Sequence, residues 1–421
     1  MFLEKLKFVF SDPGLRKKIL FVLGVLFIFR LGAIIPIPGV DAARLKEFFA
    51  GNQFFGLLNI FSGGTLDNLS IMMLGVAPYI TGSIIMQLLT MIFPRLKEIY
   101  QEEGEAGRKR FNQYSRLLTV PLAALQGFGL LALLERNGVL GDLTAFDRIF
   151  NVIIVIAGTV LLMWLGELIS EKGIGNGISI LIFAGIVSAV PSAISQTFAV
   201  FEYSQIPLVL GFLVSALVII AGVVFITEGQ RPIPISYAKR IRGMRVYGGM
   251  STYLPLRVNQ AGVIPIIFAL SILLFPQMMV SFLTGINSPT IQSISQSLLA
   301  FLNNPWVYAF LYFFLVFAFT YFYTAVTFDP DAISTNLQKQ GAFIPGIRPG
   351  RSTAEFLYRV LSRITLIGAL FLGLIAVLPL AMRAVTGLVT LTIGGTALLI
   401  VVSVVLETIK QIEAQIATME Y

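Results

Sequence analysis

Arg30, Glu167, Glu228 and Glu407 are ionisable side chains within or beside long apolar stretches of this chain. A proton or ion pump places such groups near the middle of the bilayer, paired and facing a cavity, because an uncompensated charge there is costly. All four residues instead fall toward the ends of their stretches, where a long side chain can reach the polar interface. Their positions therefore disfavour a proton-coupled transporter.

The sequence also gives no support for an enzyme. The chain has no Cys and no His, which excludes a disulfide, a thiol nucleophile and a His-ligated metal. An intramembrane protease would need an HExxH helix or a His base, and no Gly-Lys-Ser or Gly-Lys-Thr phosphate loop occurs. Gly173, Gly175 and Gly177 match a dinucleotide fingerprint only in part, because Ile178 follows them and no strand precedes them. We interpret these glycines as a loop and helix start, and we expect no enzyme, no cofactor and no metal site.

The elements that carry these residues are ten long apolar stretches. Most approach the length of about 20 residues that a helix needs to cross a bilayer core. Because a backbone in lipid must satisfy its hydrogen bonds internally, they predict an all-α fold, a polytopic bundle of transmembrane helices. With 56% hydrophobic residues and a mean hydropathy of +0.86, the chain leaves little for a separate soluble domain. The predicted spans are 19–35, 69–93, 117–134, 149–165, 178–201, 206–226, 261–282, 306–328, 360–380 and 385–406.

The basic residues are distributed asymmetrically between these spans. All but six of the 30 Lys and Arg lie in the N-terminal segment, the C-terminal tail and alternate gaps. By the positive-inside rule both termini are cytoplasmic, and the charged, polar residues 1–18 indicate no removable signal peptide. The net charge of +8 then reflects topology and attraction to anionic lipid, or docking of an acidic or RNA-bearing partner. The six exceptions are Arg30, Arg44, Lys46, Arg136, Arg148 and Arg383.

Interrupted helices suggest a pathway through the bundle. The apolar segment FFGLLNIF at 54–61 is too short to cross a bilayer and precedes Gly63 and Gly64, which is typical of a re-entrant half helix or of an interfacial helix on the outer surface. Pro78 in the second span and Pro265 in the seventh interrupt equivalent places in two sets of five spans. This pattern predicts an internal repeat, with residues 1–201 and 202–421 as halves around a central pathway.

Two predicted cytoplasmic loops, 229–260 and 327–355, are long and basic. The first contains no acidic residue, and both mix Arg with Pro and Gly. Loops that only connect helices are usually short. These two indicate a docking surface, with a polybasic loop that faces lipid as the alternative.

Six separated blocks carry a more specific signal. They are RLGAIIPIPGV (30–40), LGVAPYITGSIIMQLL (74–89), EKGIGNGISILIFAGIV (171–187), YGGMSTYLPLRVNQAGVIPIIFA (247–269), QKQGAFIPGIRPGRSTAEFL (338–357) and IGGTALLIVVSVVLETIKQIEAQ (393–415). In sequence and order they resemble the SecY/Sec61-alpha family, the channel subunits of the Sec preprotein translocase, over essentially the whole chain. The resemblance implies two pseudo-symmetric five-helix halves with a re-entrant plug helix. It also implies a pore-forming subunit that translocates unfolded preproteins across the cytoplasmic membrane and inserts apolar helices laterally into it.

The resemblance implies roles for individual residues. A ring of aliphatic side chains would close the pore at Val76, Ile80, Ile178, Ile182, Ile267 and Ile400. The i, i+4 spacing of the first two pairs puts each pair on one helix face, and a dry constriction of this kind resists water and ions when it is empty. The plug at about 54–68 would include Phe54, Leu57, Leu58, Ile60 and Phe61, with hinge freedom at Gly63 and Gly64.

The same resemblance places a lateral gate between spans 2 and 3 on one side and spans 7 and 8 on the other. Its polar candidates are Thr81, Ser83, Gln87 and Gln260. A motor ATPase or ribosome would contact Lys239, Arg240, Arg242, Arg245 and Arg348, since basic side chains suit RNA phosphates and acidic protein surfaces. The implied partners are small membrane subunits resembling SecE and SecG, the motor ATPase SecA, the ribosome, signal sequences, unfolded preproteins and anionic phospholipid. The implied location is the bacterial cytoplasmic (inner) membrane.

Two other classes of protein remain as alternatives. A secondary transporter for a small solute shares inverted repeats and broken helices. It would need a polar or charged pocket at the midplane, and the spans supply little beyond scattered Ser, Thr and Asn. A structural membrane scaffold is disfavoured by the two long basic loops.

Overall fold

The computed structural model describes residues 12–40, 45, 62, 64–66, 68–101, 103–136, 138–141, 144–199, 206–237, 240–242, 245–247, 251–283, 289–302, 304–386 and 395–419. The chain forms two compact units. Unit 1 comprises Met1–Gln205, Ser271–Asn304 and Val404–Tyr421, and unit 2 comprises Ile206–Leu270 and Pro305–Ser403.

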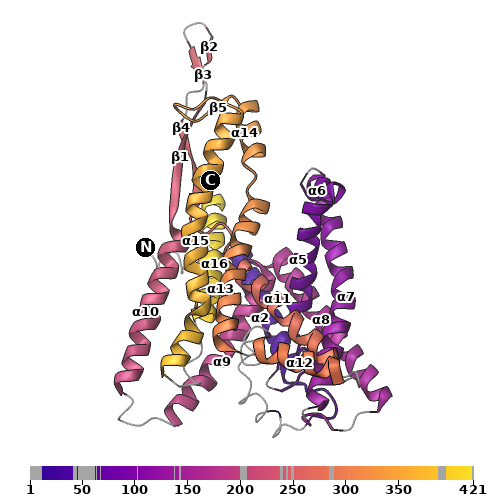
Figure 1. Ribbon diagram of the computed structural model, residues 1–421. Helices are drawn as coiled ribbons and strands as arrows, with labels where there is room; N and C mark the ends of the chain where they lie inside the picture. Colours follow the sequence, from indigo (N-terminus) through magenta and orange to yellow (C-terminus); the bar gives the residue numbers. More distant parts are fainter. Residues whose placement is uncertain are drawn as a thin grey trace. The chain divides into compact units, whose positions relative to one another are not determined.

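Each predicted span overlaps at least one of the helices labelled in Figure 1. In the described part of the chain, four helices are long and apolar enough to cross a membrane, or five if the bent pair α5 and α6 (Pro94–Gln101) forms one span. The predicted helical membrane fold is therefore confirmed, and the count of ten spans stays a prediction. The ten helices are α2 (Pro13–Ile34), α5 (Ala77–Ile92), α7 (Gly104–Arg136), α8 (Ala145–Lys172), α9 (Gly177–Ala199), α10 (Ile206–Glu228), α11 (Ile264–Leu283), α13 (Pro305–Thr327), α15 (Arg351–Thr386) and α16 (Gly395–Met419).

Several helix ends differ from the ends of the predicted spans, and most of these differences have one physical reason. Hydropathy marks only the apolar part of a helix, whereas the backbone hydrogen bonds continue through polar residues. Thus α7 begins at Gly104 and α15 at Arg351, well before the predicted starts at 117 and 360. In the second span the error is the opposite, because residues 71–76 form turns and only Ala77–Ile92 is helical.

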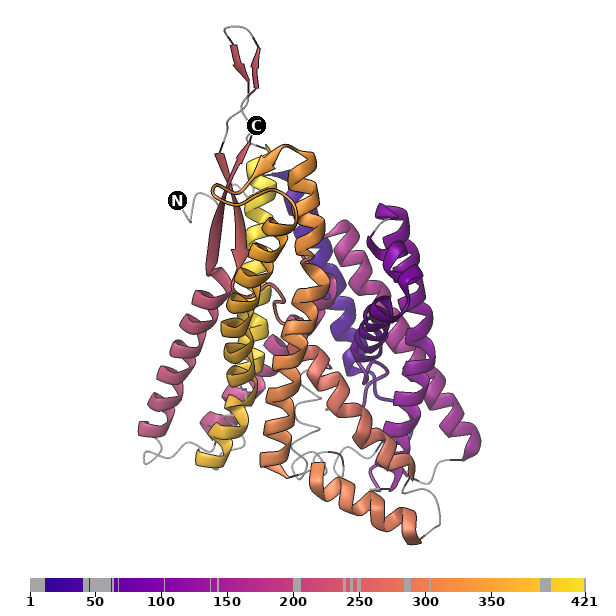
Figure 2. The same cartoon turned by 45° about the horizontal axis from the view of Figure 1, so that its top comes forward.

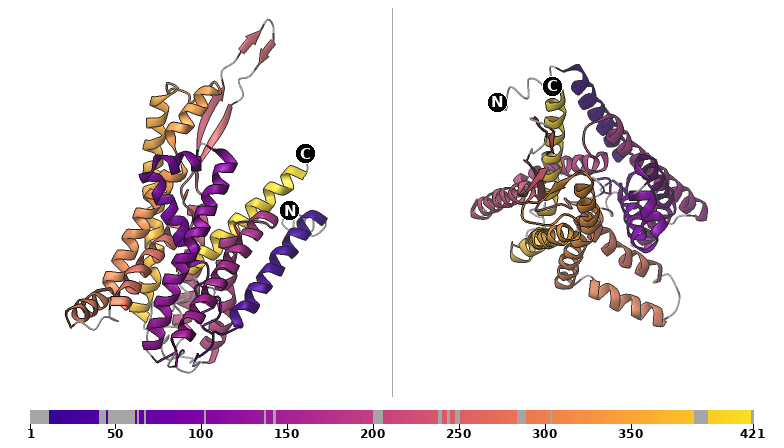
Figure 3. Two further views of the ribbon diagram at one scale, coloured as in Figure 1. Left: turned by 90° about the vertical axis from the view of Figure 1, so that its right-hand side faces the viewer. Right: turned by 90° about the horizontal axis from the view of Figure 1, so that it is seen from above.

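In unit 1, α8 is the central helix. It contacts α2, α5, α7 and α9, and α5 also lies beside α7 (Figure 3). A cluster of fully buried apolar side chains joins the turn before α5 to these helices, including Leu66, Leu69, Met73, Leu134 and Val155. This packing fixes where α5 can begin.

In unit 2, the two long loops form a small sheet instead of two separate appendages. Strands β1 (Gln230–Tyr237) and β4 (Ser251–Arg257) pair antiparallel, and β5 (Ala342–Phe343) from the second loop pairs with the other edge of β1. A short hairpin of β2 (Arg240–Arg242) and β3 (Arg245–Tyr247) extends from the end of the β1–β4 ribbon (Figure 2).

The sheet is anchored to α15. Ile233 of β1, Leu256 of β4 and Ile344 after β5 pack with Leu357 and Val360 of that helix in one buried cluster. Long-range packing of this kind holds the two loops in fixed positions.

Candidate functional site

The predicted ring begins at the turn that precedes α5. Leu69 (φ 40°) and Gly75 (φ 57°) both have left-handed backbone conformations, so the chain cannot enter the helix before this point. Val76 is the N-cap residue of α5 and its carbonyl accepts the first helical hydrogen bond, from Ile80 N–H at 3.1 Å. Pro78 follows in the first turn, where its missing N–H costs nothing. Val76 is buried and Ile80 is half-buried.

Close backbone packing holds this turn in place. A Cβ at Gly158 of α8 would collide with the carbonyl oxygen of Ile71, and a Cβ at Gly75 would lie 2.9 Å from Ser62 Cα. Only glycine allows backbones to approach so closely. Ser62 and Thr65 of the predicted plug segment therefore lie against the residues that precede Val76, with Thr65 Oγ1 donating to the Ser62 carbonyl at 2.9 Å.

The second pair of ring residues lies at the beginning of α9. Ser170 Oγ of α8 accepts a hydrogen bond from Gly177 N–H at 2.9 Å and donates to the Gly166 carbonyl at 3.1 Å. The Asn176 side chain accepts from the N–H groups of Ile178 and Ser179, which caps the helix. The glycine segment is thus a loop and helix start, as predicted. Ile182 is buried and Ile178 is half-buried.

The last two ring residues belong to unit 2. The Asn259 side chain donates to the Gly262 carbonyl at 3.1 Å, and Gly262 (φ 62°) turns the chain immediately before α11. Pro265 again lies in the first turn of the helix, and Ile267 follows it. Ile267 and Ile400, which lies near the start of α16, are both buried.

The six residues share a feature that hydropathy did not reveal. Each lies within the first six residues of its helix or at the N-cap: α5, α9, α11 and α16 all begin next to a predicted ring position. Val76, Ile80, Ile178 and Ile182 belong to unit 1, whereas Ile267 and Ile400 belong to unit 2. The closed ring therefore stays a prediction, while turns, caps and glycines fix the helix starts that carry Val76, Ile80, Ile178, Ile182 and Ile267.

Most of the predicted plug lies outside the described residues, namely Phe54, Leu57, Leu58, Ile60, Phe61 and Gly63. Gly64 has φ 74°, and a Cβ at this position would meet no atom within 4 Å. Its left-handed backbone conformation alone therefore accounts for the glycine.

The predicted gate residues of α5 are engaged mainly within their own helix. Thr81 Oγ1 donates to the Ala77 carbonyl at 3.0 Å, and Gln87 Nε2 donates to Ser83 Oγ at 3.4 Å. Gln87 Oε1 is buried without a hydrogen-bond partner in the described structure. Gln260 is half-buried in unit 2.

Three of the predicted docking residues lie on the β2–β3 hairpin, and Arg348 lies on the loop after β5. Lys239 lies outside the described residues; Arg240 and Arg242 are on β2, and the register pairs Arg242 with Arg245 of β3. Arg348 lies on a loop whose backbone is tightly bonded. Its carbonyl accepts from Thr353 Oγ1 at 2.9 Å, and the Gly350 carbonyl accepts from Ser334 Oγ at 2.6 Å.

One ion pair was not predicted from the sequence. Glu167 of α8, interpreted as a residue that reaches the interface, accepts a hydrogen bond from Arg116 Nε of α7 at 2.5 Å. The Glu167 side chain is only 18% exposed, so the pair links two helices at a partly buried position. The two residues are 51 positions apart, and no sequence spacing connects them.

Comparison with known proteins now decides the family. The SecY family model matches residues 70–409, which is more than half of the chain. The chain belongs to the SecY family. It is 46% identical to the protein translocase subunit SecY of Streptomyces coelicolor over 98% of this chain and 97% of that relative. It is also 46% identical to the protein translocase subunit SecY of Corynebacterium glutamicum, with the same coverage.

Solved structures show the same fold. The chain is similar to a protein-conducting channel, with a TM-score of 0.62, 19% identity and coverage of 94% of this chain and 91% of the other. It is also similar to Sec61 in the canine ribosome-channel complex from the endoplasmic reticulum, with a TM-score of 0.59, 18% identity and the same coverage. The chain is therefore a multi-pass membrane protein with the fold of a SecY-type channel.

Proposed function

We propose that this chain is the pore-forming subunit of a protein-conducting channel that translocates unfolded preproteins and releases apolar helices sideways into the membrane. Membership of the SecY family makes it a channel subunit of a translocase and not an enzyme. One observation carries the proposal beyond the family: helix starts at α5, α9, α11 and α16 coincide with the six predicted ring residues. Each of these helix starts carries aliphatic side chains and no charged group at its predicted ring position, which supports a dry constriction.

The chemistry of the ring suits a polypeptide as substrate. Val and Ile side chains have no polar atoms, so they offer a translocating chain no hydrogen bond that would hold it. The same side chains leave water and ions nothing to replace their hydration when the channel is empty. The segment 54–68 acts as the plug, and its described residues Ser62 and Thr65 support this because they lie against the turn before α5.

We assign the two halves and the lateral gate in the same way, from the family resemblance. The halves 1–201 and 202–421 flank the pore, and Thr81, Ser83, Gln87 and Gln260 line the lateral gate. Gln87 Oε1, which is buried without a hydrogen-bond partner in the described structure, supports a gate at which polar groups exchange hydrogen-bond partners.

The β2–β3 hairpin and the loop after β5 are the docking surface for a motor ATPase such as SecA or for the ribosome. The hairpin carries Arg240, Arg242 and Arg245, and the hydrogen bond from Thr353 to the Arg348 carbonyl supports an ordered loop at that residue. By the positive-inside rule this surface and both termini are cytoplasmic, in a bacterial inner membrane. Small subunits resembling SecE and SecG and anionic phospholipid complete the assembly.

Site-specific photo-crosslinking tests the pore. A crosslinking amino acid is placed at Ile80, Ile182 or Ile267, with Phe225 of α10 as the control because its side chain is 77% exposed. A secretory chain stalled in transit should crosslink to the three ring positions and at least tenfold less to Phe225. Failure of all three ring positions to capture the stalled chain would refute the proposal.

A further inference from the structure

One exposed face of α15 changes character along its length. Its first part carries Arg351, Glu355, Tyr358, Arg359 and Arg363, and its second part carries Leu366, Ile367, Leu370 and Leu374. These residues recur at three- and four-residue intervals, so they form a single stripe on one side of the helix. No charged residue occurs between Arg363 and Arg383. The stripe is therefore a basic segment followed directly by an apolar one.

The basic segment lines a groove. A cavity of about 680 Å³ lies between the start of α14 (Pro330–Lys339) and this face of α15, lined by Asp331, Arg351, Glu355, Tyr358, Arg359 and Arg363 among others. Arg351 is paired with Glu355 at 3.2 Å. Arg359 and Arg363 form no ion pair within the part of the chain that the structure describes. Two cations in the groove are thus left for an anion from outside the chain.

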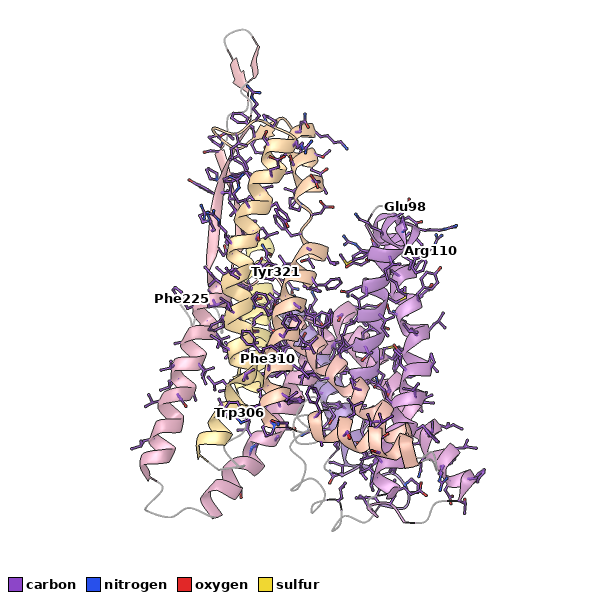
Figure 4. All side chains as sticks on the ribbon, viewed as in Figure 1. Glu98, Arg110, Phe225, Trp306, Phe310 and Tyr321 are labelled. Carbon is purple, nitrogen blue, oxygen red and sulfur yellow. The ribbon has the colours of Figure 1, made fainter. Side chains whose placement is uncertain are left out.

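The acidic groups of the groove do not cancel these cations. Glu355 is engaged with Arg351. Asp331 lies in the first turn of α14, where the helix dipole stabilises its charge. Tyr321 of α13, labelled in Figure 4, reaches α15 and donates to the Ser362 carbonyl at 3.3 Å, which fixes the helix turn that carries Arg359 and Arg363.

The dimensions of the stripe fit one leaflet of a bilayer. Eleven residues separate Arg363 from Leu374, which corresponds to about 16 Å at 1.5 Å per residue. Half of a hydrocarbon core is about 15 Å. Tyr358, 68% exposed, lies more than one turn before Arg363, at the level where aromatic rings favour the interface. The bilayer covers the apolar segment whatever occupies the groove, so a lipid is the anionic ligand that can contact both segments at once.

We propose that this stripe binds one anionic glycerophospholipid, with its phosphate on Arg359 and Arg363 and its acyl chains along Leu366, Ile367, Leu370 and Leu374. This inference assigns a site to the anionic lipid of the proposed function. It rests on that function for the choice of the cytoplasmic leaflet. Basic residues near a membrane surface attract anionic lipid, and a groove converts that attraction into a defined site.

Native mass spectrometry of the full-length chain, purified with the subunits that remain bound, tests the site. After delipidation the protein is titrated with dioleoyl phosphatidylglycerol, with dioleoyl phosphatidylcholine (the same acyl chains without net charge) and with glycerol 1-phosphate (the head group without chains). We expect saturable binding of one phosphatidylglycerol. The double variant Arg359→Gln/Arg363→Gln should weaken it about 30-fold, since each cation near the surface contributes about a fivefold effect.

Three further variants separate a lipid site from misfolding and from a general effect of surface charge. Arg359→Lys/Arg363→Lys keeps both charges and should retain most of the binding, which rules out loss through misfolding. Leu370→Gln should weaken phosphatidylglycerol but not glycerol 1-phosphate. Lys97→Gln/Arg108→Gln removes two exposed cations of unit 1 and should change nothing.

The proposal would be overturned by any of four results. The first two are a loss of lipid in the Lys97→Gln/Arg108→Gln control as large as in the Arg359→Gln/Arg363→Gln variant, and an affinity for phosphatidylcholine equal to that for phosphatidylglycerol. The others are full displacement of phosphatidylglycerol by glycerol 1-phosphate at equal concentration, and an Arg359→Gln/Arg363→Gln variant that loses a bound acidic protein while its lipid binding is unchanged. Because the assay measures lipid and not protein export, a negative result here leaves the channel function untouched.

Discussion

The close approach of α8 to the turn before α5 makes a sharp prediction about glycine. Gly158 lies in the middle of α8, and a Cβ there would collide with the carbonyl oxygen of Ile71. Gly24 lies in the middle of α2, and a Cβ there would meet no atom within 4 Å. The same substitution, glycine to alanine, should therefore have opposite effects at the two positions.

The magnitudes follow from two opposing contributions. Alanine stabilises a helix interior by up to about 1 kcal/mol relative to glycine, and this gain applies at both positions. At Gly158 the added methyl group must also displace a backbone oxygen, and overpacking of this kind costs about 1–3 kcal/mol. We expect Gly24→Ala to be neutral or stabilising and Gly158→Ala to be destabilising by about 1–2 kcal/mol.

Thermal unfolding in detergent measures the stability of both variants, and planar-bilayer conductance measures the seal. Displacement of residues 71–76 moves Val76, so Gly158→Ala should also raise the ion leak of the resting channel, whereas Gly24→Ala should not. If Gly158→Ala is as stable and as tightly sealed as Gly24→Ala, then the backbone contact does not set the start of α5.

Three more outcomes are expected. Arg116→Gln and Glu167→Gln should each lower the unfolding temperature in detergent, because each single change leaves a partly buried charge without its partner. The decrease in the double variant should be smaller than the sum of the two single decreases. Strictly additive decreases would show that the pair is not coupled. Deletion of residues 54–66 should raise ion conductance in planar bilayers, and an unchanged conductance would argue against a plug. Arg348→Glu should leave membrane insertion of the chain intact and abolish motor-driven export in vesicles, whereas Lys339→Glu in the same loop should have little effect; normal export from the Arg348 variant would remove that residue from the docking surface.

Hydropathy and charge located the helices but not their ends. The apolar run at 69–93 predicts one span, yet Leu69 and Gly75 have left-handed backbone conformations, which a right-handed helix cannot include. The glycines at 173–177 were interpreted correctly as a loop, because their spacing lacked the strand that a nucleotide site needs. Their exact function, to let Ser170 and Asn176 cap α9, depends on hydrogen bonds that single-sequence patterns do not encode.

Sequence alone determined what depends on local composition: which stretches prefer lipid, in which gaps between those stretches the cations gather, and which motifs mark the SecY family. Tertiary structure decided what depends on atoms far apart in the chain. It joined two loops through β1 and β5, paired Arg116 with Glu167, pressed Gly158 against Ile71 and placed Arg359 and Arg363 in a groove above an apolar stripe. The physical reason is that transfer free energy and positive-inside charge are sums over neighbouring residues, whereas hydrogen bonds, ion pairs and steric contacts act only between groups that folding brings together.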